Sequence, residues 1–469
     1  MLCCYPLRMN LHKASCRLPE PRREHGCYTL EGTLHFFHTT ILGNNAVVAL
    51  RKGKAMGKTF AQKVLERASE KSVFPGDTVL AEPDLVLPWN SRSGIIGKLE
   101  SALHGGIIKY PDRIAFVLEN VIQGVAGGDA VSLSEICGFL RKNKIEKLYD
   151  IGCGTCHQVI SENHHALPGT IMAGSYRDIS TYGAFNAFTA EISSAETADL
   201  LVTGRIGIRV PETIDVNLSG ILPERVAAVD LALTILGEIG SVRLKGKTLE
   251  FHGASVSTLL IHQRMTIASM CSQGELAVFP ADIITQNYFF STDYCSGALW
   301  SDFDADFCNT LEFSMDEIVP VVSKLSLEDN VCPVLELPKT SVDQVYLGGL
   351  TSGRVEDLRA ALKVMKERSV VPAVRMFVEP ASRNEYMKAL QEGLIEQFVN
   401  AGAVVLPPGC GLCTELVNGI LAPGEVCLST ADINPMEESG DKEAFIYLGS
   451  PETAAASAVT GFITDPREV

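Results

Sequence analysis

Two pairs of cysteines, each spaced C-x-x-C, are the residues of this chain with the clearest chemical potential. Cys410 and Cys413 stand in VVLPPGCGLC, after a strand-like apolar run, and Cys153 and Cys156 stand in IGCGTCHQ. A C-x-x-C pair can bind a metal, cycle between thiol and disulfide, or pack as two small side chains. Two thiols rarely complete a metal site. Four cysteines in two pairs are a strong metal-binding pattern, suited to zinc or to an iron–sulfur cluster.

Three other side chains could take part in catalysis or binding. His157 has the ring nitrogens of a general acid or base, although a hydrogen-bonded structural histidine is an equal alternative. Asp178 could act as a base if burial raises its pKa, or it could be an exposed loop aspartate. Arg354 precedes a helical segment and could bind an anion there or pair with a local acid. The adjacent His164 and His165 lie in a loop, where we expect exposure to solvent.

Alternating strand and helix patterns should position these residues. Residues 57–69 are predicted to form a helix with one apolar face, and 75–87 a turn followed by a strand. In the second half, strands are predicted at 345–349, 371–380 and 403–408, a helix at 355–368, and a capping box at Ser382 and Glu385. This order predicts an α/β fold with doubly wound, mostly parallel sheets. Sites in such folds form at the carboxyl ends of strands, so the loops at 350–354 and 408–413 should face one crevice.

Composition excludes several classes of protein. The chain has 469 residues, 46% of them hydrophobic, which is enough for two to four domains with large cores. A net charge of −16 argues against a nucleic-acid partner, because phosphate binding needs clustered Lys and Arg. No apolar run is long enough to predict a membrane span. Without a secretory signal, a disulfide framework is not expected, and we place the protein in the cytoplasm.

Residues 1–55 differ from the rest of the chain. They hold four of the 14 cysteines and a local excess of basic residues, without an apolar run typical of a signal peptide. We interpret them as a disordered or spurious extension before a start near Met56, with a transit peptide as the alternative.

From about Met56 to the C-terminus the chain resembles a known family. The segments DIGCGTCHQVISENHHALPGTIMAG, TYGAFNAF, TADLLVTGRIGIRVPETIDVNLSGILP, PPGCGLC and SPETAAASAVTGFITDP occur in the order found in large subunits of 3-isopropylmalate dehydratase, in the aconitase superfamily. The resemblance implies a three-domain aconitase-like large subunit, with domains expected at 56–205, 206–325 and 326–469. It also implies a [4Fe-4S] cluster whose open iron acts as a Lewis acid, and a separate small swivelling subunit as partner.

The cluster ligands implied by the resemblance are only partly retained. The second and third cluster cysteines fall on Cys410 and Cys413, while Leu350, in GGLTSGR, occupies the place of the first. Leucine cannot ligate iron. A modified cluster is therefore one hypothesis, with Cys153 and Cys156 supplying thiolates from a new place.

The implied catalytic and substrate-binding positions also depart from the family pattern. The family histidine of the C-H-Q segment is retained as His157, but its expected glutamate partner aligns with Gln273. Of two Asp-His pairs, one aligns with Tyr176 and Asp178 in YRDIS, and the other with Glu119 and Asn120.

Two arginines that would bind substrate carboxylates are replaced by Asp432 and Glu437. A carboxylate repels a dianion where an arginine fork binds it, so a neutral or cationic group fits better. Two functions remain open at this point. One is a hydro-lyase with an altered substrate, using His157, Asp178 or Glu119 in proton transfer and Arg354 in binding. The other is a degenerate paralogue without a cofactor that keeps the fold as a binding or regulatory subunit.

Overall fold

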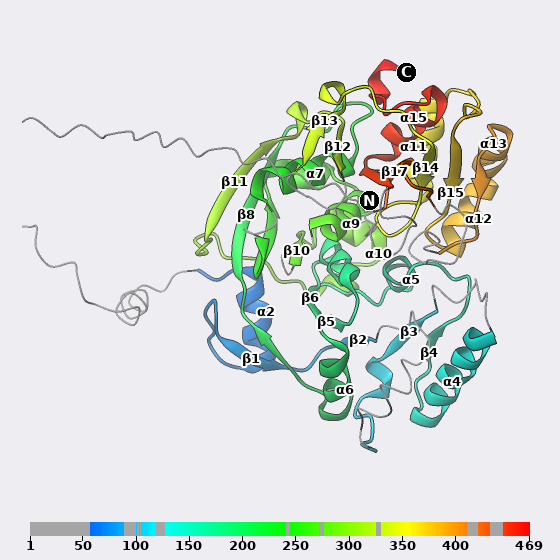
Figure 1. The fold of residues 1–469 in the computed structure, drawn as a ribbon. Coiled ribbons are helices and arrows are strands. Elements are labelled where there is room, and N and C mark those ends of the chain that lie inside the picture. Colours follow the sequence, from blue (N-terminus) through cyan, green and yellow to red (C-terminus); the bar gives the residue numbers. More distant parts are fainter. Residues whose placement is uncertain are drawn as a thin grey trace, which may run out of the picture. The chain divides into compact units, whose positions relative to one another are not determined.

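The computed structural model describes most of the chain beyond residue 56. The described residues are 57–88, 100, 103, 105–118, 127–240, 244–271, 276–324, 330–409, 421–431 and 444–469, with the backbone alone at 127–133 and 177–178. Contacts divide the chain into two units, Met1–Ala55 and Met56–Val469. All described residues belong to the second unit (Figure 1).

A seven-stranded sheet forms the C-terminal part of this unit. Its strands, in spatial order, are β13 (Val331–Pro333), β12 (Val321–Lys324), β18 (Phe445–Leu448), β17 (Val426–Ser429), β14 (Gln344–Leu347), β15 (Arg375–Val378) and β16 (Val404–Val405). The five strands from β18 to β16 run parallel, whereas β12 and β13 pair antiparallel at one side. The carboxyl ends of the five parallel strands therefore share one edge.

Four smaller sheets precede it in the sequence. The largest is all parallel, with the order β10 (Leu276–Val278), β9 (Lys247–His252), β8 (Glu212–Ser219) and β11 (Asn309–Ser314). Two others are also parallel: β2 (Leu85–Leu87), β5 (Ile171–Gly174) and β6 (Phe188–Glu191) form one, and β3 (Ala115–Val117) and β4 (Lys147–Tyr149) form the other. Only β1 (Thr78–Ala81) and β7 (Ile206–Arg209) form an antiparallel pair among these described sheets.

The helices lie between the strands in the sequence, as expected for an α/β fold. They are α2 (Phe60–Ser69), α4 (Gly127–Asn143), α5 (Cys156–Glu162), α6 (Ser194–Thr203), α7 (Ala228–Ile239), α9 (Ile261–Met270), α10 (Ile283–Phe289), α11 (Val355–Met365), α12 (Arg383–Gln391), α13 (Leu394–Asn400) and α15 (Pro451–Thr460), with a 3-10 segment η2 (Arg177–Phe185). Helices α11, α13 and α15 bury their apolar sides in one core cluster with β14, β15 and β17 (Figure 1). No described helix has the length and hydropathy needed to cross a membrane.

Most of the elements that the sequence patterns predicted occur in the structure. The α/β class with mostly parallel sheets is confirmed, as are α2, β14, α11 and β15. One difference is that 75–87 forms two strands, because the turn at Glu82–Asp84 separates β1 from β2. The three expected domain boundaries remain a prediction.

The capping box at Ser382 is only half formed. Ser382 Oγ accepts from Glu385 N at 3.1 Å, but the Glu385 carboxylate accepts from Val355 N at 2.7 Å and so caps α11 instead. The glutamate of the expected box therefore joins two helices that are consecutive in the sequence.

Candidate active site

Loops from the parallel strands of the seven-stranded sheet meet at its carboxyl edge. β14 leads into residues 348–354, β15 into 379–382, β16 into 406–409, and β17 into Thr430 and Ala431. These loops are bonded to one another: Thr351 Oγ1 donates to Thr430 O at 2.5 Å, and Gly348 N donates to Thr430 Oγ1 at 2.9 Å. The edge is therefore a single packed layer.

The loop that carries Cys153 and Cys156 is docked on this edge. Thr155 N donates to Ala381 O at 2.9 Å, and Arg383 N donates to Cys153 O at 2.9 Å. Gly154 makes the approach possible, since its φ is +126° and a Cβ there would lie 2.5 Å from Ala381 O. Because β16 lies beside β15 and runs parallel to it, the Cys153–Cys156 loop docks next to the strand that leads toward Cys410.

His157 follows this loop in the first turn of α5 and is completely buried. Burial, and then the positive charge of Arg354, lower the pKa of His157 to about 3, so its ring is neutral. Nε2 lies 3.4 Å from Thr155 Oγ1, whereas Nδ1 has no hydrogen-bond partner among the described residues. A neutral imidazole with one unpaired nitrogen can accept or donate a proton.

Arg354 is the residue before α11, and only 2% of its surface is exposed. Nε donates to Gln158 Oε1 at 2.9 Å, and Nη1 donates to Thr266 Oγ1 and Thr351 O, both at 3.2 Å. Nη2 has no partner, and no ion pair with Arg354 occurs among the described residues. Neutral acceptors therefore hold this side chain, and not the ion pair with a local acid that was one of the two predicted alternatives.

A polar network connects Arg354 to α5 and to the segment that follows β15. Gln158 Nε2 donates to Glu162 Oε1 at 2.9 Å. The same carboxylate accepts from Ser382 Oγ at 2.6 Å and from Asn384 Nδ2 at 2.8 Å. The network therefore fixes α5 against the loops that follow β14 and β15.

Tyr176, which occupies one implied catalytic position, is half-buried. Its hydroxyl donates to Tyr182 Oη at 2.6 Å and contacts the thiol of Cys156. Burial raises the pKa of Tyr176 well above its usual value, so the hydroxyl stays neutral. Asp178 lies in η2, two residues further on, where the backbone alone is described.

Other predicted site residues lie outside the described residues. These are Glu119, Cys410, Cys413, Asp432 and Glu437, together with Asn120 and Gln273. The structure therefore brings together His157, Arg354, Cys153 and Cys156, and their relation to the others stays a prediction.

The prediction that His164 and His165 are exposed is wrong. Both side chains are half-buried. His164 packs edge-on against Phe289 and Tyr294, with ring centroids 5.3 and 5.7 Å away, and His165 Nε2 lies 2.5 Å from Tyr149 Oη. The two rings point to different neighbours, so they do not form a metal pair.

Sequence reasoning missed the residues that hold Arg354. Gln158 and Thr266 lie 196 and 88 positions before it, and their residue types carry no signal of that contact. For Gln158 the one available clue is its place directly after His157 in the CHQ segment.

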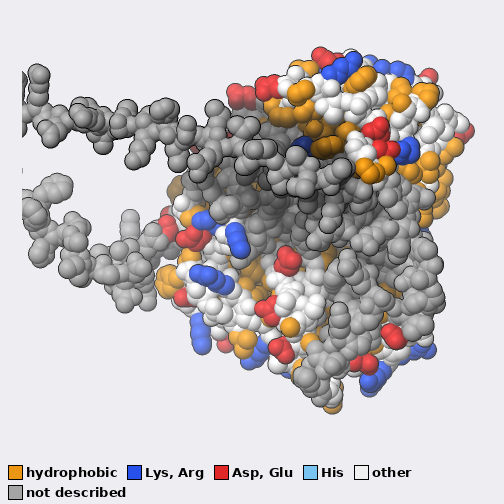
Figure 2. Space-filling view, viewed as in Figure 1, with side chains coloured by type: hydrophobic (Ala, Val, Ile, Leu, Met, Phe, Trp, Pro, Cys, Tyr) orange, Lys and Arg blue, Asp and Glu red, His pale blue; other side chains and the backbone are white. Residues whose placement is uncertain are grey.

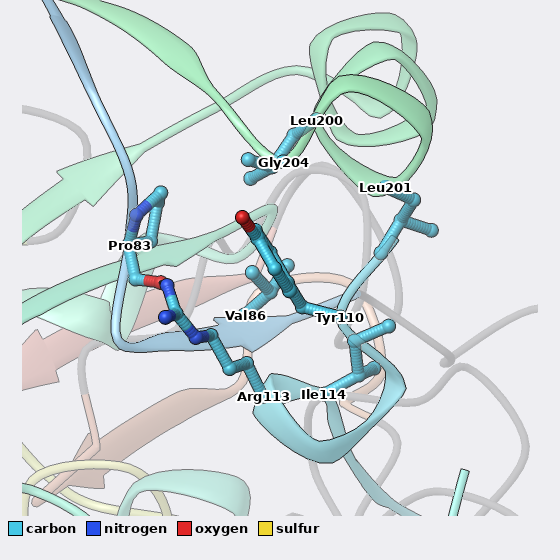
Figure 3. Close-up of a pocket in the computed structure, with 8 residues that line it drawn as sticks. All are labelled: Pro83, Val86, Tyr110, Arg113, Ile114, Leu200, Leu201 and Gly204. Carbon is cyan, nitrogen blue, oxygen red and sulfur yellow. The ribbon is translucent and has the colours of Figure 1, made fainter. Parts of the chain in front are cut away.

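A small pocket lies elsewhere in the unit (Figure 3). It encloses about 250 Å³ including the space at its mouth, and residues of β2, α6 and the segment 110–114 line it. The Arg113 guanidinium stacks on the Tyr110 ring at 4.4 Å and donates to Pro83 O. None of the predicted site residues lines this pocket.

Comparison with known proteins places the chain in a family. A sequence model of the aconitase family (aconitate hydratase) matches residues 129–461. This chain belongs to the aconitase family. A 3-isopropylmalate dehydratase large subunit 1 from Methanopyrus kandleri is 35% identical to it over 415 residues, which cover 88% of this chain and 99% of the relative.

Other aconitase-family relatives have related names. A 3-isopropylmalate dehydratase large subunit 2 from Archaeoglobus fulgidus is 36% identical over 88% of this chain and 100% of its own length. A probable methanogen homoaconitase large subunit from Methanosarcina mazei is 37% identical over 76% of this chain and 92% of its own length. Among solved structures, aconitase X from Thermococcus kodakaraensis matches with a TM-score of 0.47 and 10% identity, over 86% of this chain and 98% of that one.

Leu350 is the residue that the resemblance aligns with the first cluster cysteine. Leu350 follows Gly349 at the carboxyl edge, is half-buried and offers no ligating atom. Within the described part of the chain, no three His, Cys, Asp or Glu side chains are arranged to hold a metal ion. Because Cys410 and Cys413 lie outside the described residues, the cluster-binding set implied by the resemblance stays a prediction.

Proposed function

We propose that this chain is a hydro-lyase of the aconitase family that acts on a small hydroxy-compound other than 3-isopropylmalate. The observation that supports this best is the docking of the Cys153–Cys156 loop, followed by the buried, neutral His157, on the carboxyl edge of β15. In an α/β sheet this edge is where ligands bind. Arg354 reaches the same place from the loop after the neighbouring strand β14, and its Nη2 amino group has no partner in the described part of the chain.

The proposal includes a relocated iron–sulfur cluster. Cys153 and Cys156 would provide two thiolates and Cys410 and Cys413 the others, because β16 ends five residues before Cys410 and pairs with β15. Four bound thiolates would give every iron of a [4Fe-4S] cluster a protein ligand, so one of the four would have to leave its iron before the cluster could supply a Lewis acid for a hydroxyl group. A zinc site made by the same cysteines is the competing outcome.

Metal content tests the four-cysteine site directly. The full chain is purified without oxygen, and iron, sulfide and zinc are measured per chain for the wild type and for Cys153→Ser, Cys156→Ser, Cys410→Ser and Cys413→Ser, with Cys332→Ser as a control outside both pairs. We expect the wild type to contain iron and sulfide, and each of the four cysteine substitutions to remove them. Folded protein without metal, indifferent to all four, would contradict the site.

The proposed proton-transfer residues are His157, Asp178 and Glu119. Asp432 and Glu437 would face a neutral or cationic end of the substrate, because these carboxylates repel a dianion. We therefore expect no turnover of 3-isopropylmalate with a cognate small subunit, and turnover among hydroxy-compounds with at most one carboxylate. Efficient turnover of 3-isopropylmalate would refute this substrate choice.

We also propose that the chain works with a separate small subunit, in the cytoplasm. The relatives named above are large subunits, and the chain spans nearly their whole length. Co-expression with a candidate small subunit, followed by affinity purification of one chain, should retain the other.

A second candidate function is a degenerate paralogue that serves as a binding or regulatory subunit. Leu350 favours it, because that residue removes one cluster ligand of the family pattern. A chain that binds a partner protein but contains no metal and turns over no hydroxy-compound would support this alternative.

A further inference from the structure

An amine, a thiol and a carboxylate meet at the amino edge of the four-stranded parallel sheet. Glu212 is the first residue of β8, Lys247 is the first residue of β9, and Cys308 directly precedes β11. Glu212 and Lys247 are partners in the β8–β9 ladder, and Cys308 N donates to Thr213 O at 2.8 Å. Three strands of one sheet therefore hold these side chains, and β8 and β11 lie side by side (Figure 1).

The amine of Lys247 lies against the thiol of Cys308. Nζ donates to Cys308 Sγ at 3.6 Å and to Glu212 Oε2 at 2.8 Å. Neighbouring strands are about 4.8 Å apart, so the side chain of Lys247 crosses β8 to reach the residue before β11. Glu212 thus helps to hold the nitrogen next to the sulfur.

Cys308 is also accessible to small oxidants. Of the described cysteines it is the exposed one, whereas the others are half-buried or buried. A peroxide oxidises an accessible thiolate to a sulfenic acid, which a thiol or a nitrogen placed next to it can trap. Lys247 supplies such a nitrogen.

We propose that Lys247 and Cys308 form an oxidant-dependent covalent crosslink, a sulfenamide bond between Nζ and Sγ, with hydrogen peroxide as the oxidant. This modification site goes beyond the proposed function, because its residues belong to a different sheet from the candidate active site. The crosslink joins β9 to the segment before β11 across β8, so it stabilises the four-stranded sheet under oxidising conditions. Thiol reductants reverse it.

The reaction consumes one molecule of hydrogen peroxide in two steps. First the Cys308 thiolate attacks a peroxide oxygen, the O–O bond breaks, and the sulfur loses two electrons to give sulfenic acid and, with the thiol proton, one water. Then Nζ, having passed one ammonium proton through Glu212 to solvent, attacks the sulfur. The N–S bond forms, the S–O bond breaks, and hydroxide leaves with a second proton from the nitrogen as water. Amine, thiol and peroxide thus give the sulfenamide and two waters.

The crosslinking rate should rise with pH. Burial raises the pKa of Cys308, against the opposing effect of the Lys247 charge, and the hydrogen bond to Glu212 raises the pKa of Lys247. Lys247 and Glu212 are the charged groups that face the thiol. Thiol and ammonium must each lose a proton to react, so crosslinking should be at least about tenfold faster at pH 9 than at pH 7.

Mass spectrometry of the full chain tests the crosslink. Reduced protein is treated with hydrogen peroxide at pH 7 and pH 9, the remaining thiols are alkylated, and the chain is cleaved after acidic residues. The peptides that contain Lys247 and Cys308 should appear as one species, lighter than their sum by two hydrogen atoms, and dithiothreitol should separate them. Separate peptides with Cys308 oxidised, a joined species that retains an added oxygen, or a disulfide of Cys308 would each overturn the proposal.

Variants identify the reacting groups. Cys308→Ser and Lys247→Arg should abolish the crosslink; arginine keeps the positive charge beside Glu212, but its guanidinium is not deprotonated. Cys332→Ser, which removes a half-buried thiol of the seven-stranded sheet, is the control and should give the full yield.

Thermal unfolding measures the effect of the crosslink on the fold. Oxidation should raise the melting temperature of the wild type by about 5 °C relative to oxidised Lys247→Arg, because a crosslink restricts the unfolded chain. Crosslinking of Cys308 that persists in Lys247→Arg would refute the assignment of the amine. Equal melting temperatures of the two oxidised proteins would refute the stabilising role.

Discussion

The guanidinium of Arg354 donates from Nε to Oε1 of Gln158 at 2.9 Å, across 196 positions of sequence. This bond connects the loop after β14 to α5, the helix that begins at Cys156. It places the buried cation beside His157 and so helps keep that imidazole neutral. The electrostatics of the candidate site thus depend on a neutral amide.

Replacing Gln158 should therefore destabilise the protein more than the size of the Gln158 side chain suggests. Gln158→Leu leaves Arg354 Nε without an acceptor and removes the donor to Glu162. We expect a loss of about 2 kcal/mol in the free energy of unfolding, measured in urea. Gln397→Leu, on the exposed side of α13, is the control and should change stability little. Equal effects of the two substitutions would contradict the role of the amide.

Gly154→Ala should separate the Cys153–Cys156 loop from the sheet edge. An added Cβ would lie 2.5 Å from Ala381 O, and the φ of +126° disfavours any L side chain. Gly402→Ala is a matched control, because its φ is +92° and nothing lies within 4 Å of the added atom. Both variants carry the backbone cost of about 1 kcal/mol.

Only Gly154→Ala should add a steric cost and, if the four-cysteine site exists, lower the bound metal. The two melting temperatures and metal contents are compared directly. Indistinguishable variants would show that the close approach at Ala381 is not needed.

Three carboxyl groups, of the fully buried Asp230 and the half-buried Asp357 and Glu452, predict that stability falls as the pH rises. Burial is the main cause that raises the pKa of Asp230 to about 7, of Asp357 to about 6 and of Glu452 to about 8; the Asp230 carboxylate also raises that of Glu452. In the unfolded chain these groups ionise near pH 4. The folded state therefore binds more protons between about pH 4 and pH 8, and folding loses stability with increasing pH in that window.

The expected slope is about 3 kcal/mol per pH unit between pH 5 and pH 7, since each of the three groups contributes up to about 1.4 kcal/mol per pH unit, and it is measured by urea unfolding at several pH values. Glu452→Gln removes the group with the highest pKa, and Glu452 Oε2 has no hydrogen-bond partner to lose. This variant should flatten the slope between pH 6 and pH 8. An unchanged slope would mean that Glu452 does not titrate in that range.

Replacing Arg264, which lies away from the candidate site, should have a large effect on stability. Its fully buried guanidinium makes two bonds to Asp282, at 2.9 and 2.6 Å, and donates to Leu259 O and Val256 O. Lysine cannot reproduce this fork, so Arg264→Lys should lower the free energy of unfolding by about 3 kcal/mol.

Arg359→Lys, which alters an ion pair at the surface, should cost less than about 0.5 kcal/mol. Thermal and urea unfolding of both variants provide the comparison. A small effect at Arg264 would show that water can replace the buried bonds.

Local patterns in the sequence predicted the elements but not all of their partners. The apolar spacing in α2 and α11 and the buried run in β14 identified these elements, because periodicity follows directly from helix and strand geometry. The capping box at Ser382 was predicted from type and spacing alone. Glu385 instead caps α11, because tertiary packing brings Val355 N within reach of its carboxylate.

Exposure was also decided by the tertiary structure. His164 and His165 look like loop residues in the sequence, yet aromatic side chains from 288–294 and from β4 cover them. The distribution of charged side chains follows the composition, which contains many acidic and many basic residues. On the described surface of the face in Figure 2, acidic and basic side chains are interspersed.

The sequence by itself determined the α/β class, the family and the residue types of the site, including leucine at position 350. These follow from short-range patterns and from motifs in a fixed order. Only the tertiary structure decided that Arg354 has no anionic partner among the described residues, that His157 is neutral, and that the Cys153–Cys156 loop lies on the carboxyl edge of β15. Burial and long-range hydrogen bonds set charge states and free donors, and neither is encoded in local spacing.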